Sequence, residues 1–254
     1  MKILFFNSYR MLSKNSSKPD VRASFIKYIN KCAQNYDAIC LAESSSQAIG
    51  INDLLPKYQL YSSELANTRL YQHGFKFAIA HSIDCHVQSL NCQIDEFPDQ
   101  EFINLNENKG YCSEQLFSIT HGNAEVVAVH IQAIDSRNEM KDLSRYSQNA
   151  GLKRLCTYIC DVKPDIVIGD FNLNQKSLTK KLRDFGFDID DSDYSFVDCG
   201  GNDVSGSSIH HAISRNKDAY IKYICDVQTH LTTAMHVEIQ GGDYRHTHYE
   251  INKS

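Results

Sequence analysis

One segment, residues 164–174 (PDIVIGDFNLN), constrains the fold of this chain more than any other. Its β-branched run at 166–168 is typical of a strand that is buried on both faces. The run ends abruptly in a Gly-Asp-Phe-Asn sequence. Because Asp170 and Asn172 are two residues apart, they project to the same side if the extended conformation continues. The segment therefore predicts a carboxylate and an amide side by side at the edge of a sheet.

This pair of side chains suits the chemistry of phosphate esters. A carboxylate can hold a cation or align a nucleophile, and an amide can donate to a phosphoryl oxygen. The alternative is that Asp170 only begins a turn and caps the segment that follows, as Asp often does. A Gly-Asp pair alone favours that alternative, whereas the full order GDFN after a hydrophobic strand is much more specific.

Length and composition predict a single domain spanning residues 1–254. The chain has 42% hydrophobic and 22% charged residues, which is ordinary for a soluble globular protein of one substantial core. No apolar stretch reaches the length that spans a bilayer, so no transmembrane segment is expected. The apolar start, MKILFFNSYR, is too short for the core of a secretory signal and is interpreted as a strand.

The cysteines and the net charge limit the cellular setting. Nine cysteines are scattered without a CxxC pair, and several lie inside apolar runs, which favours reduced, buried thiols in a cytoplasm over a disulfide framework or a zinc site. Delivery as an effector or toxin stays open, because such proteins can lack ordinary signals. The net charge of −5 argues against a protein that coats nucleic acid by charge alone. It is compatible with an enzyme that has a local basic rim.

Three further apolar runs end in, or contain, a polar residue. They are KILFFN (2–7) ending in Asn7, YDAICLAES (36–44) with Glu43, and AEVVAVHIQAI (124–134) with His130. Each residue has a purely structural alternative: a turn for Asn7, a first helical turn for Glu43, and a hydrogen-bonded core position for His130. Glu43 is the best metal-ligand candidate of the chain.

Apolar residues at helical spacing predict helices at 20–35, 135–162 and 175–186, and a further helix is expected around 44–55, after Glu43. The helix at 175–186 carries several basic residues around its apolar face. They are Lys176, Lys180, Lys181 and Arg183. A solvated helix face is favoured for them over a rim that contacts phosphate. The first of these helices, at 20–35, would cover one face of a sheet.

The GDFN run resembles the signature of the endonuclease/exonuclease/phosphatase superfamily, which includes DNase I and the exonuclease III type of abasic-site endonucleases. The resemblance covers almost the full chain in the same order. Asn7 resembles the Asn that ends the first strand, LAE with Glu43 resembles an LQE strand end, and VAVHIQ with His130 resembles an NTHL strand. It implies a four-layer α-β-β-α sandwich, DNase I-like, in which two mixed, mainly antiparallel sheets lie face to face with helices outside.

The resemblance also implies a function, a phosphodiesterase that depends on Mg²⁺ or Mn²⁺, with a nuclease acting on DNA or RNA as the favoured form. Glu43 would hold the metal, and Asn7 and Asp170 would complete its shell or align water, while Asn172 and His130 would bind the phosphate. The expected partner is nucleic acid as substrate. Fold alone does not choose among DNA, RNA and phospholipids. The alternatives are a phospholipid or inositol-phosphate phosphatase, and a degenerate member that binds a phosphorylated ligand or a protein.

The sequence departs from the superfamily pattern near the C-terminus. The superfamily shows an Ile-Asp pair on one strand and a Ser-Asp-His before the last strand. In SSIHHAISRN (207–216), His210 stands in the place of the Asp. A gapless match of LTTAMHVEI (231–239) sets Ala234 against the His, and a shift of two residues sets His236 there instead. His230 is a third candidate.

The missing base leads to a hypothesis about the histidines. Because adjacent strand residues face opposite sides, only one of His210 and His211 can enter the cleft, and register favours His210. An imidazole, with a pKa of about 6.5, suits proton transfer near neutral pH. The expectation is a rearranged base centred on His210, with His236 as its partner. Loss of a base costs a factor of about 10² to 10⁴ in rate, so without such a substitute the enzyme would be crippled.

Overall fold

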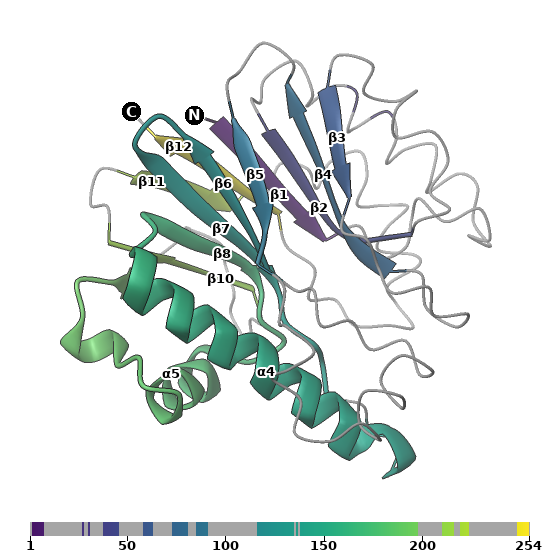
Figure 1. The fold of residues 1–254 in the computed structure, drawn as a ribbon, viewed down its shortest axis with the longest axis vertical. Coiled ribbons are helices and arrows are strands. Elements are labelled where there is room, and N and C mark those ends of the chain that lie inside the picture. The colour runs from purple at the N-terminus through teal and green to yellow at the C-terminus, as the bar shows by residue number, and fades with distance from the viewer. Residues whose placement is uncertain are drawn as a thin grey trace.

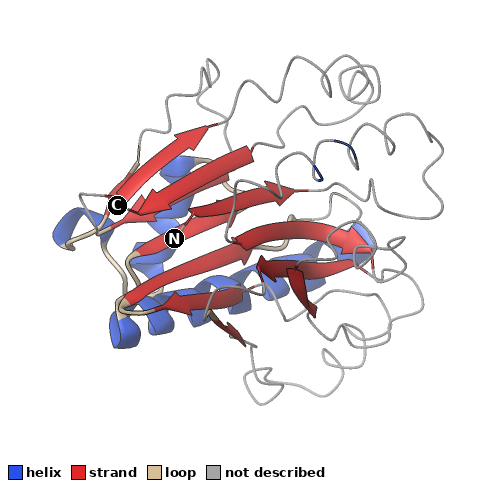
Figure 2. Ribbon diagram, turned by 90° about the horizontal axis from the view of Figure 1, so that it is seen from above, coloured by secondary structure: helices blue, strands red, loops and turns tan. Residues whose placement is uncertain are grey.

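The computed structural model describes residues 2–7, 27, 30, 38–45, 58–62, 73–80, 85–90, 116–134, 136, 138–197, 210–215, 219–223 and 248–253, and the structural statements below concern these residues. They form two sheets with helices against one of them (Figures 1 and 2). Among the helices in this part of the chain, none is long and apolar enough to cross a membrane.

The first sheet has six strands in the order β11-β12-β1-β2-β4-β3. Their bounds are β1 (Lys2–Asn7), β2 (Ala38–Ser45), β3 (Tyr58–Ser62), β4 (His73–Ala80), β11 (Ala219–Tyr223) and β12 (His248–Lys253). β1 and β2 are parallel, and the other neighbouring pairs are antiparallel. The sheet is therefore mixed and mainly antiparallel, as the resemblance implied.

The second sheet also has six strands, in the order β5-β6-β7-β8-β10-β9. Their bounds are β5 (His86–Ser89), β6 (Leu116–His121), β7 (Ala124–His130), β8 (Ile166–Asp170), β9 (Ser195–Phe196) and β10 (His210–Ser214). Only β7 and β8 are parallel among the pairs described. Each sheet thus contains one parallel pair, and the carboxyl ends of such a pair lie at the same sheet edge.

The two sheets pack face to face around a shared apolar core. One buried cluster combines side chains of β1 and β2 with side chains of β6, β7, β8 and β10. Its members are Ile3, Phe5, Ala38, Cys40, Phe117, Ile119, Val126, Ala128, Ile166, Ile168 and Ala212. Burial of this apolar surface is the dominant favourable contribution to joining the sheets.

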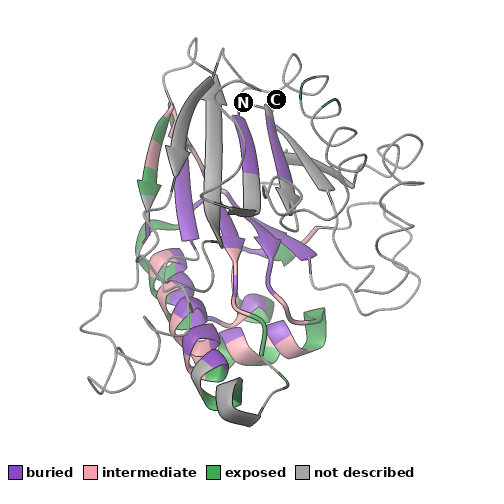
Figure 3. Ribbon diagram, turned by 90° about the vertical axis from the view of Figure 1, so that its right-hand side faces the viewer, coloured by how far each residue is buried: buried purple, intermediate pink, exposed green. Residues whose placement is uncertain are grey.

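Helices cover the other face of the second sheet. The long helix α4 (Asn138–Val162) and the shorter α5 (Gln175–Asp184) lie against it (Figure 1). A second buried cluster joins Val127, Val129, Val167 and Ile213 of the strands to Leu152, Leu155, Ile159, Leu178 and Leu182 of the helices. The central strands β7 and β8 are therefore buried on both faces (Figure 3), which explains why they are continuous apolar runs in sequence.

Three layers are thus described: sheet, sheet and helices. The expected fourth layer depends on helices at 20–35 and 44–55. Lys27 and Asn30 are helical, whereas Ser44 and Ser45 belong to the end of β2, and the other residues of the two ranges lie outside the described residues. The segments 91–112 and 231–239 also lie outside them. The predicted strands at 2–7, 36–44 and 124–134 and the helix at 135–162 are confirmed, with small shifts at their ends.

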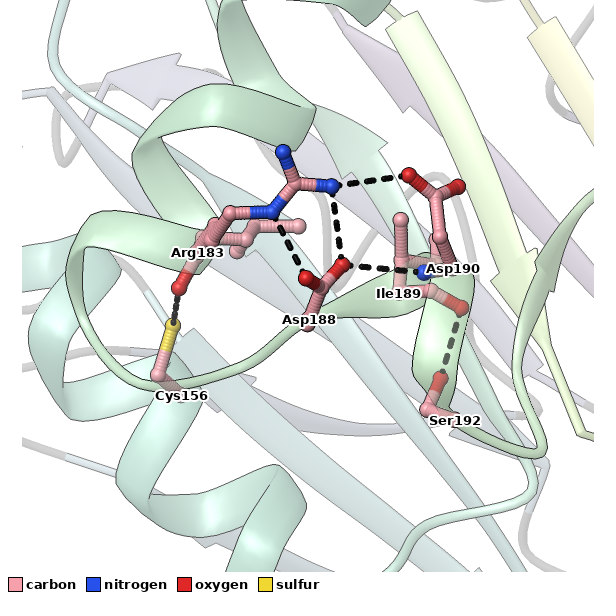
Figure 4. Close-up of polar contacts among 7 residues, drawn as sticks. Cys156, Arg183, Asp188, Ile189, Asp190 and Ser192 are labelled. Carbon is pink, nitrogen blue, oxygen red and sulfur yellow. Dashed lines mark hydrogen bonds and ion pairs between the residues drawn. The ribbon is translucent and has the colours of Figure 1, made fainter.

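The end of α5 is fixed by a local network of charges (Figure 4). Arg183 donates from Nε and Nη2 to the Asp188 carboxylate, at 2.6 and 3.1 Å, and from Nη2 to Asp190 at 2.9 Å. The hydrogen bonds from Arg183 lower the pKa of Asp188. The thiol of Cys156 on α4 lies 3.8 Å from the carbonyl oxygen of Leu182. The guanidinium of Arg183 is therefore paired with two local carboxylates, which favours a structural role for Arg183 over contact with phosphate.

The cysteines within the described residues are free thiols, namely Cys40, Cys85, Cys156 and Cys160. Cys40 and Cys156 are buried, as expected, whereas Cys85 is only partly buried and Cys160 is exposed. Burial raises the pKa of Cys40 well above its ordinary value, and burial likewise raises the pKa of Cys156 to about 12. Both thiols are thus held in the neutral form, which makes them packing residues and poor nucleophiles.

Candidate active site at the ends of β7, β8 and β10

Three predicted site residues lie in one row across the second sheet. In the parallel pair β7 and β8, His130 is the register partner of Asp170. In the antiparallel pair β8 and β10, the partner of Asp170 is His210. The end of β7, the end of β8 and the start of β10 therefore bring His130, Asp170 and His210 to the same edge, although they are far apart in sequence.

The contact between Asp170 and His210 is buried. Nε2 of His210 lies 3.3 Å from Oδ2 of Asp170, and the two side chains are 0% and 1% exposed, respectively. The other carboxylate oxygen, Oδ1, accepts a hydrogen bond of 2.9 Å from the backbone N–H of Asn172. Both oxygens of Asp170 thus have a protein neighbour, and the orientation of the carboxylate is fixed.

Gly169 explains why this strand end has the sequence Gly-Asp. A Cβ atom at this position would lie 2.0 Å from the carbonyl oxygen of Val129 on β7, and the φ angle is +150°. The rigid backbone of a neighbouring strand cannot move away by the required amount. Only glycine allows β7 and β8 to approach closely where His130 and Asp170 pair.

Asn172 forms the turn that follows β8. Its φ angle of 50° lies in the left-handed region, which Asn tolerates better than most residues. Its Nδ2 donates to the carbonyl oxygen of Ile131 at 2.7 Å, which links the turn to the segment after His130. An amide nitrogen carries two hydrogens, so this contact uses only one of them. The simple expectation of extended backbone from Asp170 to Asn172 is wrong, because the chain turns at Asn172.

The segment after β7 is held by a second amide. Nε2 of Gln148 on α4 donates to the carbonyl oxygen of Gln132 at 3.0 Å, and Gln148 is 1% exposed. The backbone N–H of Ile131 donates to the carbonyl oxygen of Asp170 at 2.7 Å. His130 itself is half-buried. Sequence patterns gave no reason to select Gln148, because its role depends on the packing of α4 beside β7.

His210 and His211 lie on opposite faces of β10, as alternation predicted. His210 lies against Asp170. His211 lies on the helix side, where its Nε2 is 2.8 Å from the carbonyl oxygen of Leu173. Its ring contacts the rings of Phe171 and Phe196. The side chain that meets the candidate site directly is therefore that of His210.

Asn7 and Glu43 lie at one edge of the first sheet, where the structure describes their backbone. Asn7 pairs in register with Ala42, the residue before Glu43. The pairing of β2 with β4 shifts register between Leu41 and Ser44, the interval that contains Glu43. The topology thus brings the two expected metal ligands of this sheet to neighbouring strand ends.

A histidine that sequence reasoning did not select lies at the same edge. The last strand, β12, begins at His248, whose register partner is Phe6, next to Asn7. In sequence, the end of the superfamily pattern resembles 231–239, and His236 lies outside the described residues. The short alternating run HYEINK at 248–253 was the available signal of a strand.

The fit of a divalent cation depends on oxygen ligands from both sheets. Within the described side chains, no three His, Cys, Asp or Glu residues form a group that could hold a metal ion. The expected set, Asn7, Glu43 and Asp170, consists of carboxylates and an amide, the ligands that Mg²⁺ and Mn²⁺ prefer. Asp170 contributes a fixed carboxylate, and the chemistry of the set therefore fits a hard cation.

No family model matches the sequence, and no curated protein matches it. Solved structures do match the fold. The 3'-5' exonuclease NExo from Neisseria meningitidis aligns with a TM-score of 0.55 and 12% identity over 100% of both chains. The human Nocturnin catalytic domain aligns with a TM-score of 0.57 and 11% identity, over 100% of this chain and 94% of that one.

An endonuclease/exonuclease/phosphatase family protein from Bacteroides thetaiotaomicron aligns with a TM-score of 0.54 and 10% identity, over 100% of this chain and 98% of that chain. These similarities cover the whole chain, and their low identity makes them comparisons of fold. The chain has the DNase I-like α/β fold of the superfamily that the GDFN run resembles. That expectation is confirmed at the level of the fold.

Proposed function

We propose that this protein is a divalent-metal-dependent phosphodiester hydrolase whose favoured substrate class is nucleic acid. The observation that carries the proposal is the row of His130, Asp170 and His210 at the ends of β7, β8 and β10. The shared fold supports it, since its solved neighbours include an exonuclease. Polar groups at the carboxyl ends of parallel strands are the usual place for a site in an α/β fold.

Each residue has a proposed role. Asn7, Glu43 and Asp170 would hold the cation, which when bound would stabilise the charge of the phosphoryl group and lower the pKa of water. Asn172, through its second amide hydrogen, and His130 would donate to phosphoryl oxygens. The fixed carboxylate of Asp170 and the fixed turn at Asn172 supply donors and acceptors in a preorganised geometry.

The proton acceptor is proposed to be His248. The resemblance places a catalytic His just before the last strand, and His248 is the first residue of β12, beside the end of β1. His210 is fully buried against Asp170, a geometry that suits orientation of the carboxylate better than proton transfer with solvent. In this scheme His210 acts through Asp170, and His236 is an alternative acceptor.

Nucleic acid is proposed as substrate on the basis of the neighbours. NExo from Neisseria, described as a 3' phosphatase, has been solved bound to a product DNA hairpin. A phospholipid or inositol phosphate would use the same metal chemistry. The experiment must therefore offer both classes of phosphate ester, together with a small diester that needs no substrate pocket.

The test measures hydrolysis of bis(p-nitrophenyl) phosphate, single-stranded and duplex DNA, RNA and phosphatidylinositol phosphates by the purified chain with Mg²⁺, Mn²⁺ or EDTA. We expect metal-dependent cleavage of DNA or RNA that falls about 10² to 10⁴-fold in His248→Ala. The matched control is His86→Ala. His86 is exposed at the start of β5, the edge strand that β6 and β7 separate from Asp170 on β8.

Three other outcomes would change the proposal. Loss of activity in His210→Ala with full activity in His248→Ala would return the base to His210. Cleavage of phosphoinositides alone would replace the substrate class. Absence of hydrolysis on every substrate, with metal binding detected by calorimetry, would overturn the enzyme and favour a member of the fold that only binds phosphorylated ligands.

A further inference from the structure

The residue next to His210 makes a contact that the proposed chemistry does not use. His211 is 8% exposed, and its Nε2 lies 2.8 Å from the carbonyl oxygen of Leu173. A carbonyl oxygen only accepts, so Nε2 carries the hydrogen. The neutral Nε2–H tautomer and the imidazolium can both donate here, and the contact therefore does not depend on the charge of the ring.

Two aromatic rings fix the orientation of this imidazole. The centroid of the His211 ring lies 5.8 Å from that of Phe171, with the planes tilted by 52°. It lies 5.6 Å from that of Phe196, in an edge-to-face arrangement at 73°. Such contacts are favourable beyond simple burial and hold the ring in one plane. The donor nitrogen is thus directed at Leu173 by packing from β9 and from the turn itself.

The accepting carbonyl belongs to the residue directly after Asn172, whose φ angle is 50°. A left-handed residue outside glycine persists where its surroundings hold it. On its N-terminal side the turn is held by Asp170, which accepts from the Asn172 N–H, and on its C-terminal side by Asn174, which caps α5 by accepting from the Ser177 N–H. Between these two contacts, His211 of β10 holds the turn through the carbonyl oxygen of Leu173.

We propose that His211 is a positioning residue that sets the Asn172 turn and thereby the amide that contacts phosphate. The start of β10 then holds residues 170–173 from both faces: His210 contacts Asp170, and His211 contacts the carbonyl oxygen of Leu173. This inference rests on the proposed function for its catalytic consequence alone. Its structural consequence, a fixed Asn172, is measured without any substrate.

The test uses two substitutions with opposite chemistry. His211→Phe keeps an aromatic ring between Phe171 and Phe196 and removes the donor. His211→Gln removes the ring and restores an N–H at a similar distance from the backbone. The matched control is Tyr194→Phe. It removes a buried hydrogen bond of 2.5 Å from the Tyr194 hydroxyl to the carbonyl oxygen of Pro164, which precedes β8.

Amide hydrogen exchange by NMR is the first measurement. We expect the Asn172 N–H to exchange about tenfold faster in His211→Phe and at close to the wild-type rate in His211→Gln. In Tyr194→Phe the exchange of Asn172 should not change relative to the amides of β7. Unchanged exchange of Asn172 in His211→Phe would overturn the inference, as would equal acceleration along the whole of β8.

Hydrolysis of the best substrate is the second measurement. For His211→Phe we expect kcat to fall about tenfold at constant KM, with recovery in His211→Gln. A loss of kcat in Tyr194→Phe of the same size would show a general effect of stability and contradict a positioning role. If the wild-type chain hydrolyses nothing, the proposed function fails, and hydrogen exchange alone decides the role of His211.

Discussion

The two ends of β8 each carry an aspartate, and the two carboxylates are used in different ways. Asp165 precedes the strand and is half-buried; Oδ2 accepts from the Glu125 N–H at 2.9 Å, and its carbonyl oxygen accepts from Ser214 and Arg215. Asp170 ends the strand, is fully buried, and faces His210 and the left-handed turn. The first end joins strands to one another, while the second presents polar groups at a sheet edge.

The difference shows that one end of β8 stabilises the fold, while the other end carries the residues of the candidate site. The first end also holds a polar network in which Ser118 and Tyr158 both donate to the Glu125 carboxylate. These are ordinary structural solutions for polar groups next to a core. The second end contains the features that cost stability, a φ-positive glycine, a φ-positive asparagine and a buried histidine, which is typical of functional sites.

The largest effect is expected at Gly169. Gly169→Ala places a methyl group 2.0 Å from the Val129 carbonyl oxygen and should destabilise the fold by more than about 4 kcal/mol, so that little soluble protein forms. The matched control, Gly122→Ala, has nothing within 4 Å and should cost about 1 to 2 kcal/mol for its φ angle of +58° alone. Urea unfolding measures both. Equal stability of the two variants would show that β7 and β8 can separate freely.

The second prediction compares the two aspartates directly. Asp170→Asn should lower the rate of hydrolysis about 10² to 10⁴-fold, because the fixed carboxylate would no longer be an anion. Asp165→Asn should leave the rate unchanged and lower the free energy of unfolding by about 1 kcal/mol. Initial rates with Mn²⁺ and urea unfolding of both variants provide the measurements. A loss of activity in Asp165→Asn alone would reverse the assignment of the two ends.

The third prediction concerns pH at the structural end. Burial and the hydrogen bond with Glu125 raise the pKa of Tyr158 from 10.0 to about 12. The folded protein favours the neutral phenol, so this stabilisation is complete below pH 10.0 and is lost as the pH rises to about 12. Stability measured across that range should fall more steeply for the wild type than for Tyr158→Phe. Parallel curves would show that the Glu125 contact does not persist in solution.

The smallest effect is expected at the end of α5, away from both ends of β8. Arg183→Gln removes the hydrogen bonds to Asp188 and Asp190, which are exposed and screened by salt. Because Arg183 lowers the pKa of Asp188, the stabilisation is present above the ordinary pKa of 3.8 and is lost as the pH falls through the lowered value. The thermal midpoint should drop slightly at neutral pH and match the wild type in 1 M NaCl.

Much of the second sheet could be predicted from local patterns. The apolar runs at 166–168 and around His130 identified buried strands, and the apolar spacing at 135–162 identified α4. Burial on both faces leaves a continuous apolar run in the sequence, and burial on one face of a helix leaves a helical period. The glycine of the GDFN segment was part of the signal. Glycine is required at position 169 because the backbone of Val129 lies so close. Val129 is forty positions earlier, so this requirement could not be recognised from the local sequence.

Several site features depended on pairings between distant segments. The C-terminal end was matched to 231–239, although the last strand begins at His248, because short strands of mixed polarity give a weak pattern. Register also decided that Asp170 faces His210, and helix packing placed Gln148 beside Gln132. The turn at Asn172 departed from extended backbone because Asp170 and Ile131 each bind it.

The sequence by itself determined the α/β class, the buried strands of the core and the polar residues that end them. These properties are local, since periodicity and turn chemistry act over a few neighbouring residues. Only the tertiary structure decided that His130, Asp170 and His210 share one row, that His211 reaches Leu173, and that His248 lies beside β1. The reason is physical: strand order and register are set by which apolar faces pack together, and that choice is made by the whole core at once.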